Sequence, residues 1–223
     1  MLLLPVICSS AISQKSNTLT LEEFKEGWQL LFDGETLDGW KGYNTNYPKT
    51  WEVRDSALYC SGEKGGVDIM TEEMYGDFDF KFEWKIEEKG NSGVMWHVRE
   101  GKQWNAPPLT GPEYQVYDEQ NQFHKNSAGS CYDVYETSKD KKVNPAMEWN
   151  SGRIRVCKGQ VTYWLNDVIT VNYHLYSKEW EKRVADSKWK DKPFYGRSPF
   201  GHIDFQNHHS KVWYKNIKIR ELD

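Results

Sequence analysis

Residues 78–86 read F-D-F-K-F-E-W-K-I, a stretch in which apolar and charged side chains alternate without a break. A period of two is the signature of a β-strand with one face in a core and the other in water. Lys81, Glu83 and Lys85 lie on the face that we expect to be exposed to solvent. The apolar face, which we expect to be buried as a unit, consists of Phe78, Phe80, Phe82, Trp84 and Ile86.

About a dozen short runs of strand character, this one included, follow one another between turn residues. Two short helices are expected, one opened by the capping box of residues 20–23 and one from Ser177 to about Ser187. Strands at this density with so little helix indicate an all-β jelly-roll β-sandwich with one or two peripheral helices. We expect a single domain over residues 18–223.

Composition narrows the function classes. The 223 residues are 38% hydrophobic and 28% charged, so a sizeable core is possible. A formal charge of −4 and the lack of a basic stripe argue against a nucleic-acid partner. Eleven Trp and thirteen Tyr suit both a sandwich core and sugar stacking. No later stretch is long enough to span a membrane.

The first residues, M-L-L-L-P-V-I-C-S-S-A-I-S-Q, resemble the apolar core and cleavage zone of a secretory signal, although the usual basic start is absent. We therefore expect residues 1–17 to be a signal segment and linker. A lipid anchor on Cys8 is the alternative. Cys60, Cys131 and Cys157 would remain, without metal-type spacing, and we expect buried thiols or one disulfide.

The stretch G-P-E-Y-Q-V-Y-D-E-Q, residues 111–120, carries the densest polar chemistry. Glu113 and Gln115 share one face of a strand, and Tyr114 and Val116 suit the core face. Asp118 would join Glu113 and Gln115 only across a β-bulge, a feature that is common beside active sites. A polar strand face is otherwise just the solvent side of a sheet.

Two further strands carry comparable polar rows. Alternation in residues 93–99 places His97 and Arg99 on one face with Gly93 and Met95. In the second strand His202, Asp204, Gln206 and His208 are expected to line one face, opposite Ile203 and Phe205. A lone strand histidine is more often a surface residue than a catalyst. We nevertheless predict that His97, Glu113, Gln206 and His208 converge on one groove.

Several motifs in combination resemble the 3-keto-disaccharide hydrolase domain family, over nearly all of residues 30–220. They are L-F-D-G-E-T-L-D-G-W (31–40), W-E-V-R-D-S-A-L (51–58), G-D-F-D-F-K-F-E-W (76–84), N-S-G-V (91–94), G-P-E-Y-Q-V-Y-D (111–118), E-W-N (148–150) and the closing G-H-I-D-F-Q-N-H-H-S-K-V-W-Y-K-N-I-K-I (201–219).

The resemblance implies a concanavalin-like jelly roll, export to the bacterial periplasm or cell surface, and action on glycosides oxidised at C3. It also implies that the family's polar positions fall on Glu113, Gln115, Asp118, Asn91, Gln206 and His208. Trp149 and Asn150 of the E-W-N motif are added as candidate substrate-binding residues. The chain has Asn207 where the family more often has Asp before the histidine.

A second resemblance is to laminarinase-type glycosidases, whose active strand reads E-x-D-x-x-E. This chain has Glu113, Gln115 and Asp118 in that frame. An amide in place of the middle acid disfavours the ordinary mechanism with two carboxylates.

A 3-keto sugar has an acidic proton at C2, so a base can start elimination of the C1 substituent, and water can then add. His97 or Glu113 would be the base and Asp118 the acid. Arg99, Gln115 or a divalent metal ion would hold the enolate, and the spacing leaves the metal open. The competing hypotheses are this enzyme, an ordinary retaining glycosidase, and a non-catalytic carbohydrate-binding module.

Overall fold

The computed structural model describes residues 15–119 and 122–223, which form two packed antiparallel sheets. Residues 1–14 of the expected signal segment lie outside the described residues, as does Gln120. None of the helices in the described part is long and apolar enough to cross a membrane.

The large sheet has eight strands in the order β11-β10-β9-β6-β13-β4-β3, and β1 pairs with β13 outside this path. Its strands are β1 (Gln29–Leu30), β3 (Trp51–Arg54), β4 (Ala57–Cys60), β6 (Phe78–Ile86), β9 (Asn150–Cys157), β10 (Gln160–Leu165), β11 (Val168–His174) and β13 (Val212–Glu221).

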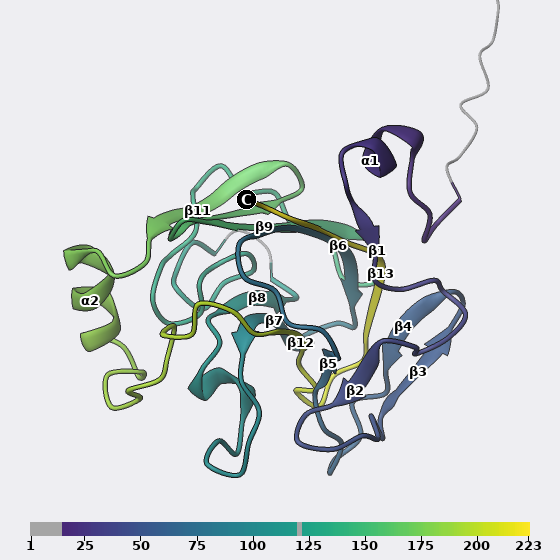
Figure 1. Cartoon of the computed structure of the whole chain (residues 1–223), viewed down its shortest axis with the longest axis horizontal. Helices are drawn as coiled ribbons and strands as arrows, with labels where there is room; N and C mark the ends of the chain where they lie inside the picture. Colours follow the sequence, from purple (N-terminus) through teal and green to yellow (C-terminus); the bar gives the residue numbers. More distant parts are fainter. Residues whose placement is uncertain (1–14, 120–121) are drawn as a thin grey trace, which may run out of the picture.

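The small sheet has five strands in the order β2-β5-β12-β7-β8. They are β2 (Trp40–Gly42), β5 (Ile69–Thr71), β7 (Asn91–Val98), β8 (Glu113–Tyr117) and β12 (His202–Phe205). Helix α1 (Leu21–Lys25) lies beside β1 at one end of the molecule, and α2 (Lys178–Ala185) lies at the opposite end, near β11 (Figure 1). A 3-10 turn, Pro107–Leu109, sits in the β7–β8 connection.

The core lies between the two sheets. All five apolar residues of β6 are buried there, which confirms the prediction made from the alternation. Aromatic rings interlock across the interface: the Phe82 ring centroid is 5.4 Å from that of Tyr114 on β8, and that of Phe205 on β12 is 4.2 Å from that of Tyr214 on β13. The jelly-roll β-sandwich expected from the sequence is therefore confirmed.

Both expected helices form where their capping residues predict. Thr20 caps α1 in a reciprocal capping box with Glu23, and Ser177 caps α2, which buries Trp180 and Val184. In the run 131–135, Cys131 and Tyr135 make only isolated bridges.

The thiols of Cys60, Cys131 and Cys157 are all free, so among the described residues no disulfide forms. Burial raises the pKa of the Cys60 thiol to about 11 and that of Cys131 to about 12, which keeps both protonated.

Candidate active site

The outer face of the small sheet, turned away from the core, carries a row of side chains in register. Glu113 pairs with Met95, Met95 with Asp204, Asp204 with Met70, and Met70 with Lys41. Residues paired across antiparallel strands share a face. The row therefore places two carboxyl groups, Glu113 and Asp204, on one surface, two strands apart, with Met95 between them.

Gly93 makes room for the Glu113 side chain. A Cβ added to Gly93 would lie 2.1 Å from Glu113 Oε1 and 2.8 Å from its Cγ. The carboxylate therefore crosses from β8 over the bare backbone of β7, and any side chain at position 93 would displace it. This explains why glycine follows Ser92 in a strand, where it otherwise weakens the structure.

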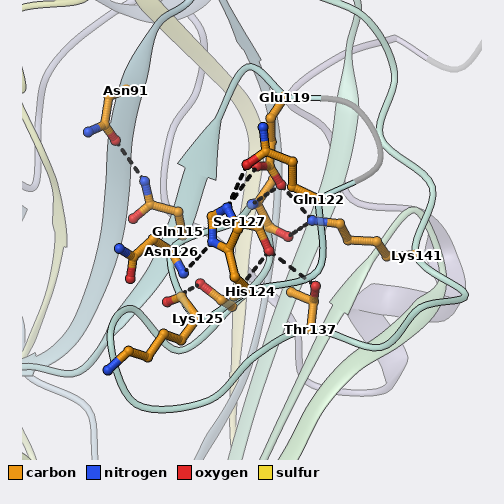
Figure 2. A network of polar contacts seen from close by, with 12 residues as sticks. Asn91, Gln115, Glu119, Gln122, His124, Lys125, Asn126, Ser127, Thr137 and Lys141 are labelled. Atoms are coloured by element: carbon orange, nitrogen blue, oxygen red, sulfur yellow. Dashed lines mark hydrogen bonds and ion pairs between the residues drawn. The ribbon is translucent and has the colours of Figure 1, made fainter. Parts of the chain in front are cut away.

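One register step along, Gln115 pairs with Gly93 and donates an Nε2–H bond to Asn91 Oδ1 at 2.7 Å (Figure 2). Its Oε1 is buried and has no hydrogen-bond partner among the described residues. The sheet edge at β8 is covered by the segment 129–132, because Gln115 N donates to Ser130 O and Gly129 N donates to Gln115 O. Asn91, Gln115 and Glu113 thus form a continuous polar surface.

The loop that follows β8 is anchored by an ion pair excluded from water. Lys141 Nζ lies 2.7 Å from Glu119 Oε1, and both side chains are almost fully buried. The same Glu119 oxygen accepts from Ala128 N, and Ser127 contacts Thr137 through their hydroxyls (Figure 2). Breaking such a buried pair leaves an uncompensated charge. It therefore holds the loop, and with it segment 129–132, against the edge of the small sheet.

Burial raises the pKa of Glu113 to about 8, the Lys188 ammonium opposes that rise, and the Asp68 carboxylate adds to it. Lys188 is exposed and its Nζ lies 3.8 Å from the centre of the Tyr132 ring. Glu113 is therefore a carboxyl group poised to gain or lose a proton near neutral pH, with a cation and an aromatic ring nearby.

Asp68 and Asp204 are two further acidic groups on this side of the molecule, and the charge of Asp68 acts on both Glu113 and Asp204. Burial, and then the charges of Asp68 and Glu113, raise the pKa of Asp204 well above its ordinary range. Burial also raises the pKa of Asp68 to about 7, although its carboxylate accepts a hydrogen bond from Asn207 N at 2.8 Å. Both Asp204 oxygens are buried without a hydrogen-bond partner among the described residues. Buried acceptors are normally satisfied, so this set is typical of a functional site.

A metal ion has weak support in this geometry. Within residues 15–119 and 122–223, no group of three or more His, Cys, Asp or Glu side chains gathers closely enough to hold one. Glu113 and Asp204, separated by Met95, have backbones about two strand spacings apart, roughly 10 Å.

The prediction that His97 shares the site with Glu113 is wrong, because β7 contains a bulge. The register shifts so that Val98 pairs with His202 while Met95 pairs with Asp204, which places one extra residue in β7. His97, with φ 53°, turns away; its Nε2 lies 2.8 Å from Gly76 O and its ring packs on Phe78.

The same bulge redirects Arg99. Its guanidinium lies 4.8 Å from the centre of the Phe200 ring, and its backbone N–H donates to Thr110 Oγ1. Arg99 therefore packs on the loop before β12, and Val98 joins Met95 and Met70 on the outer face. Neither His97 nor Arg99 reaches the polar surface formed by Glu113, Gln115 and Asn91.

Asp118 is also placed differently from the expectation. β8 is regular from Glu113 to Tyr117, so the predicted bulge that would return Asp118 to the face of Glu113 is absent from that strand. Its Oδ2 instead accepts a hydrogen bond from Lys89 N at 2.7 Å in the β6–β7 turn. Asp118 stabilises that turn.

Trp149 and Asn150 lie on the other sheet. The Trp149 ring has the ammonium groups of Lys215 and Lys85 at 4.2 and 5.0 Å, on the outer face of the large sheet. Asn150 is buried, and its side chain bonds the 144–148 loop. The two residues are therefore separated from Glu113 by the whole core.

Gln206 lies in register with the candidate site, and His208 follows it two residues later. Gln206 N donates to Gly93 O, so its backbone continues the β12–β7 ladder one residue beyond the strand. His208 is exposed in the following turn. Of the four residues predicted to converge, Gln206 is in register with Gly93, over which the Glu113 side chain passes, whereas His97 turns away toward Gly76.

Sequence reasoning missed Asp68 and Lys188, and it placed Asp204 in a polar row without singling it out. The signal for Asp204 was present, since it alternates with Ile203 and Phe205. Asp68 and Lys188 lie outside regular strands, where periodicity carries no information about orientation.

We expect the free energy of unfolding to fall as pH rises from about 4.5 to about 8. Glu113 keeps its proton in the folded state but loses it near pH 4.5 when unfolded, so its stabilising effect is full below pH 4.5 and disappears through pH 8. Urea titrations across this range measure the slope. Glu113→Gln should flatten it, and an equal slope in the variant would contradict the assignment.

Most of the chain resembles known proteins. Residues 27–220 match the family described as the 3-keto-alpha-glucoside-1,2-lyase-like domain. A 3-keto-disaccharide hydrolase of Bacteroides thetaiotaomicron is 28% identical over 240 residues, an alignment that covers 93% of this chain and 82% of that protein.

Among solved structures, a protein of Parabacteroides distasonis assigned as a glycosyl hydrolase superposes with a TM-score of 0.87 at 39% identity, over 94% of this chain and all of the other. A carbohydrate-binding module of Bacillus subtilis superposes with a TM-score of 0.54 at 12% identity, over 82% of this chain and 96% of the module. The latter likeness concerns the fold alone.

Proposed function

Because this chain belongs to the 3-keto-alpha-glucoside-1,2-lyase-like domain family, we propose that it cleaves the glycosidic bond of glycosides oxidised at C3. The observation that carries the proposal is Glu113, a buried carboxyl group with a pKa raised to about 8, held over Gly93 beside a cation. The relatives also support the more general conclusion that the chain is a glycoside-cleaving enzyme.

In the proposed first step Glu113 removes the proton from C2. The electron pair of the broken C2–H bond passes into the C3 carbonyl and forms an enolate. A base with a pKa near the working pH is effective in this role. The Lys188 ammonium and the free hydrogen of the Gln115 amide are the groups near Glu113 that can stabilise the negative oxygen.

In the second step the enolate collapses, the C1–O bond breaks and a double bond forms between C1 and C2. The leaving oxygen takes a proton from an acid, for which Asp68 is the better candidate, because Asp68 is only partly buried and Asp204 is fully buried. Water then adds at C1 and a proton returns to C2, so the overall change is hydrolysis.

Unpartnered acceptors suit a sugar ligand. The Asp204 carboxyl and Gln115 Oε1 are buried polar groups without a partner among the described residues, and the hydroxyl groups of a sugar would satisfy them. The half-buried Tyr132 ring, packed by Lys188, offers an apolar surface at the edge of β8, where Tyr132 N donates to Glu113 O. We propose that the sugar ring lies along the outer face of the small sheet, and that the protein works in the periplasm or at the cell surface.

The two mechanisms differ in the fate of the proton at C2. In heavy water, elimination followed by hydration should place deuterium at C2 of the released sugar, and direct displacement at C1 should not. Aliquots reduced immediately with borohydride would fix the label before mass spectrometry. The released 3-keto sugar, incubated without enzyme, corrects for spontaneous exchange. Product free of C2 deuterium at full turnover would favour the retaining glycosidase.

The parent disaccharide, unoxidised at C3, is the matched substrate control. Turnover of the 3-keto-disaccharide alone supports the proposal, and turnover of the parent at a similar rate contradicts it. Binding of either compound without turnover would indicate a carbohydrate-binding module.

A further inference from the structure

The outer face of the large sheet contains a hollow of about 610 Å³ on the opposite side of the sandwich from Glu113. Its floor is a row in register across four strands, from Trp164 on β10 through Arg153 on β9 and Lys81 on β6 to Lys218 on β13. This volume lies within the range of roughly 300–1,000 Å³ that is typical of small-ligand sites.

Most cations of this hollow already have an acidic partner. Arg153 Nη2 lies 2.6 Å from Asp79 Oδ2, and Lys218 Nζ lies 2.6 Å from Glu23 Oε2. Lys81 differs: within the described residues its ammonium has no ion pair, and its close neighbour is the Trp28 ring at 4.1 Å. Burial, and then the charge of Arg153, lower the pKa of Lys81. A half-buried cation in this position would gain from an anion.

The rest of the lining argues for one negative charge and several hydroxyl groups. Glu83 and Asp167 line the hollow and would repel a polyanion such as a nucleic acid or a polyphosphate. Carboxylate oxygens such as those of Asp167 accept hydrogen bonds from hydroxyls. The half-buried Trp164 indole, with the Arg153 guanidinium 4.6 Å from its ring centre, adds an aromatic wall.

We propose that this hollow binds an acidic sugar residue of a glycan, with the sugar carboxylate on Lys81 and the ring against Trp164. The site shares no residue with the outer face of the small sheet. It would therefore hold an acidic polysaccharide while the other face works on a separate glycoside, and its existence does not depend on the reaction proposed above.

Calorimetric titration of the full chain with tri-galacturonate tests the proposal. The fully methyl-esterified trimer is the control that keeps the sugar and removes the charge. Sodium acetate is the control that keeps the carboxylate and removes the sugar. We expect tri-galacturonate to bind and both control compounds to bind at least about tenfold more weakly. This difference in affinity corresponds to the loss of one charge-assisted contact. Equal binding of the ester, or of acetate, would overturn the proposal.

Lys81→Met keeps the side-chain stem and removes the charge, and we expect it to weaken tri-galacturonate binding about tenfold. Lys85→Met is the matched control, because Lys85 lies on the same face of β6 against Trp149 and Trp213 and does not line the hollow. Thermal melts verify folding. No binding by the unmodified chain up to about 10 mM, or equal losses in the two variants, would refute the site.

Discussion

Glu113→Gln is expected to lower kcat/KM for a 3-keto-glycoside by about 10²–10⁴-fold, the usual contribution of a general base. The amide keeps the shape of the side chain over Gly93 and cannot accept the C2 proton. The measurement is initial-rate kinetics at pH 8, where the wild-type carboxyl is half ionised. A loss smaller than about fivefold would remove Glu113 from the chemistry. The substitution does not separate elimination from displacement, since both use this carboxylate, and the heavy-water experiment does.

Asp118→Asn is the matched control for that experiment. Asp118 is another carboxylate of the same segment, and it accepts a hydrogen bond from Lys89 N in a turn. We expect its kcat/KM to stay within about threefold of wild type, with a stability loss of about 1 kcal/mol from the weakened turn. A loss comparable to that of Glu113→Gln would restore the pair of carboxylates that the E-x-x-x-x-D spacing suggests.

Phe82→Ala is expected to reduce the free energy of unfolding by about 3–5 kcal/mol, the usual range for a buried phenylalanine. Its ring lies at the centre of the aromatic interface between the sheets. Ring centroids of Phe80, Tyr114, Phe205 and Tyr214 all lie 5.3–6.3 Å from that of Phe82. Urea denaturation with linear extrapolation measures the change.

Phe24→Ala provides the comparison for the core substitution. Phe24 lies on α1 and is 70% exposed, so the same change there should alter stability by less than about 0.5 kcal/mol. A cost below about 1 kcal/mol for Phe82→Ala would mean that the core tolerates a cavity at this position.

The fold could be predicted from the sequence because its strands obey a simple period. Alternation in residues 78–86 identified the buried face of β6 residue by residue, and Thr20 and Ser177 marked both helix starts. Glu113 and Gln115 were placed on one face for the same reason. These are local properties, and each follows from a few neighbouring side chains.

The site could be predicted only in part, because its other determinants are not local. His97 was assigned to the wrong face since a bulge leaves no clear mark in the alternation of apolar residues. Trp149 was expected to bind substrate but lies on the outer face of the large sheet, because nothing in its motif indicates which sheet it joins. The raised pKa of Asp204 depends on residues that lie far away in the chain.

The bulge in β7 also has a consequence for how this strand varies among descendants of a common ancestor. Before the bulge, Gly93 and Met95 lie on the outer face, so selection acts on mutations there through that face. After the bulge, Val98 takes that place. Loss of one residue at the bulge would exchange the surroundings of Val98 and Arg99 in a single event. In alignments of β7, the positions that tolerate polar residues should therefore change from odd-numbered to even-numbered at His97. Insertions and deletions should be rare on either side of that residue.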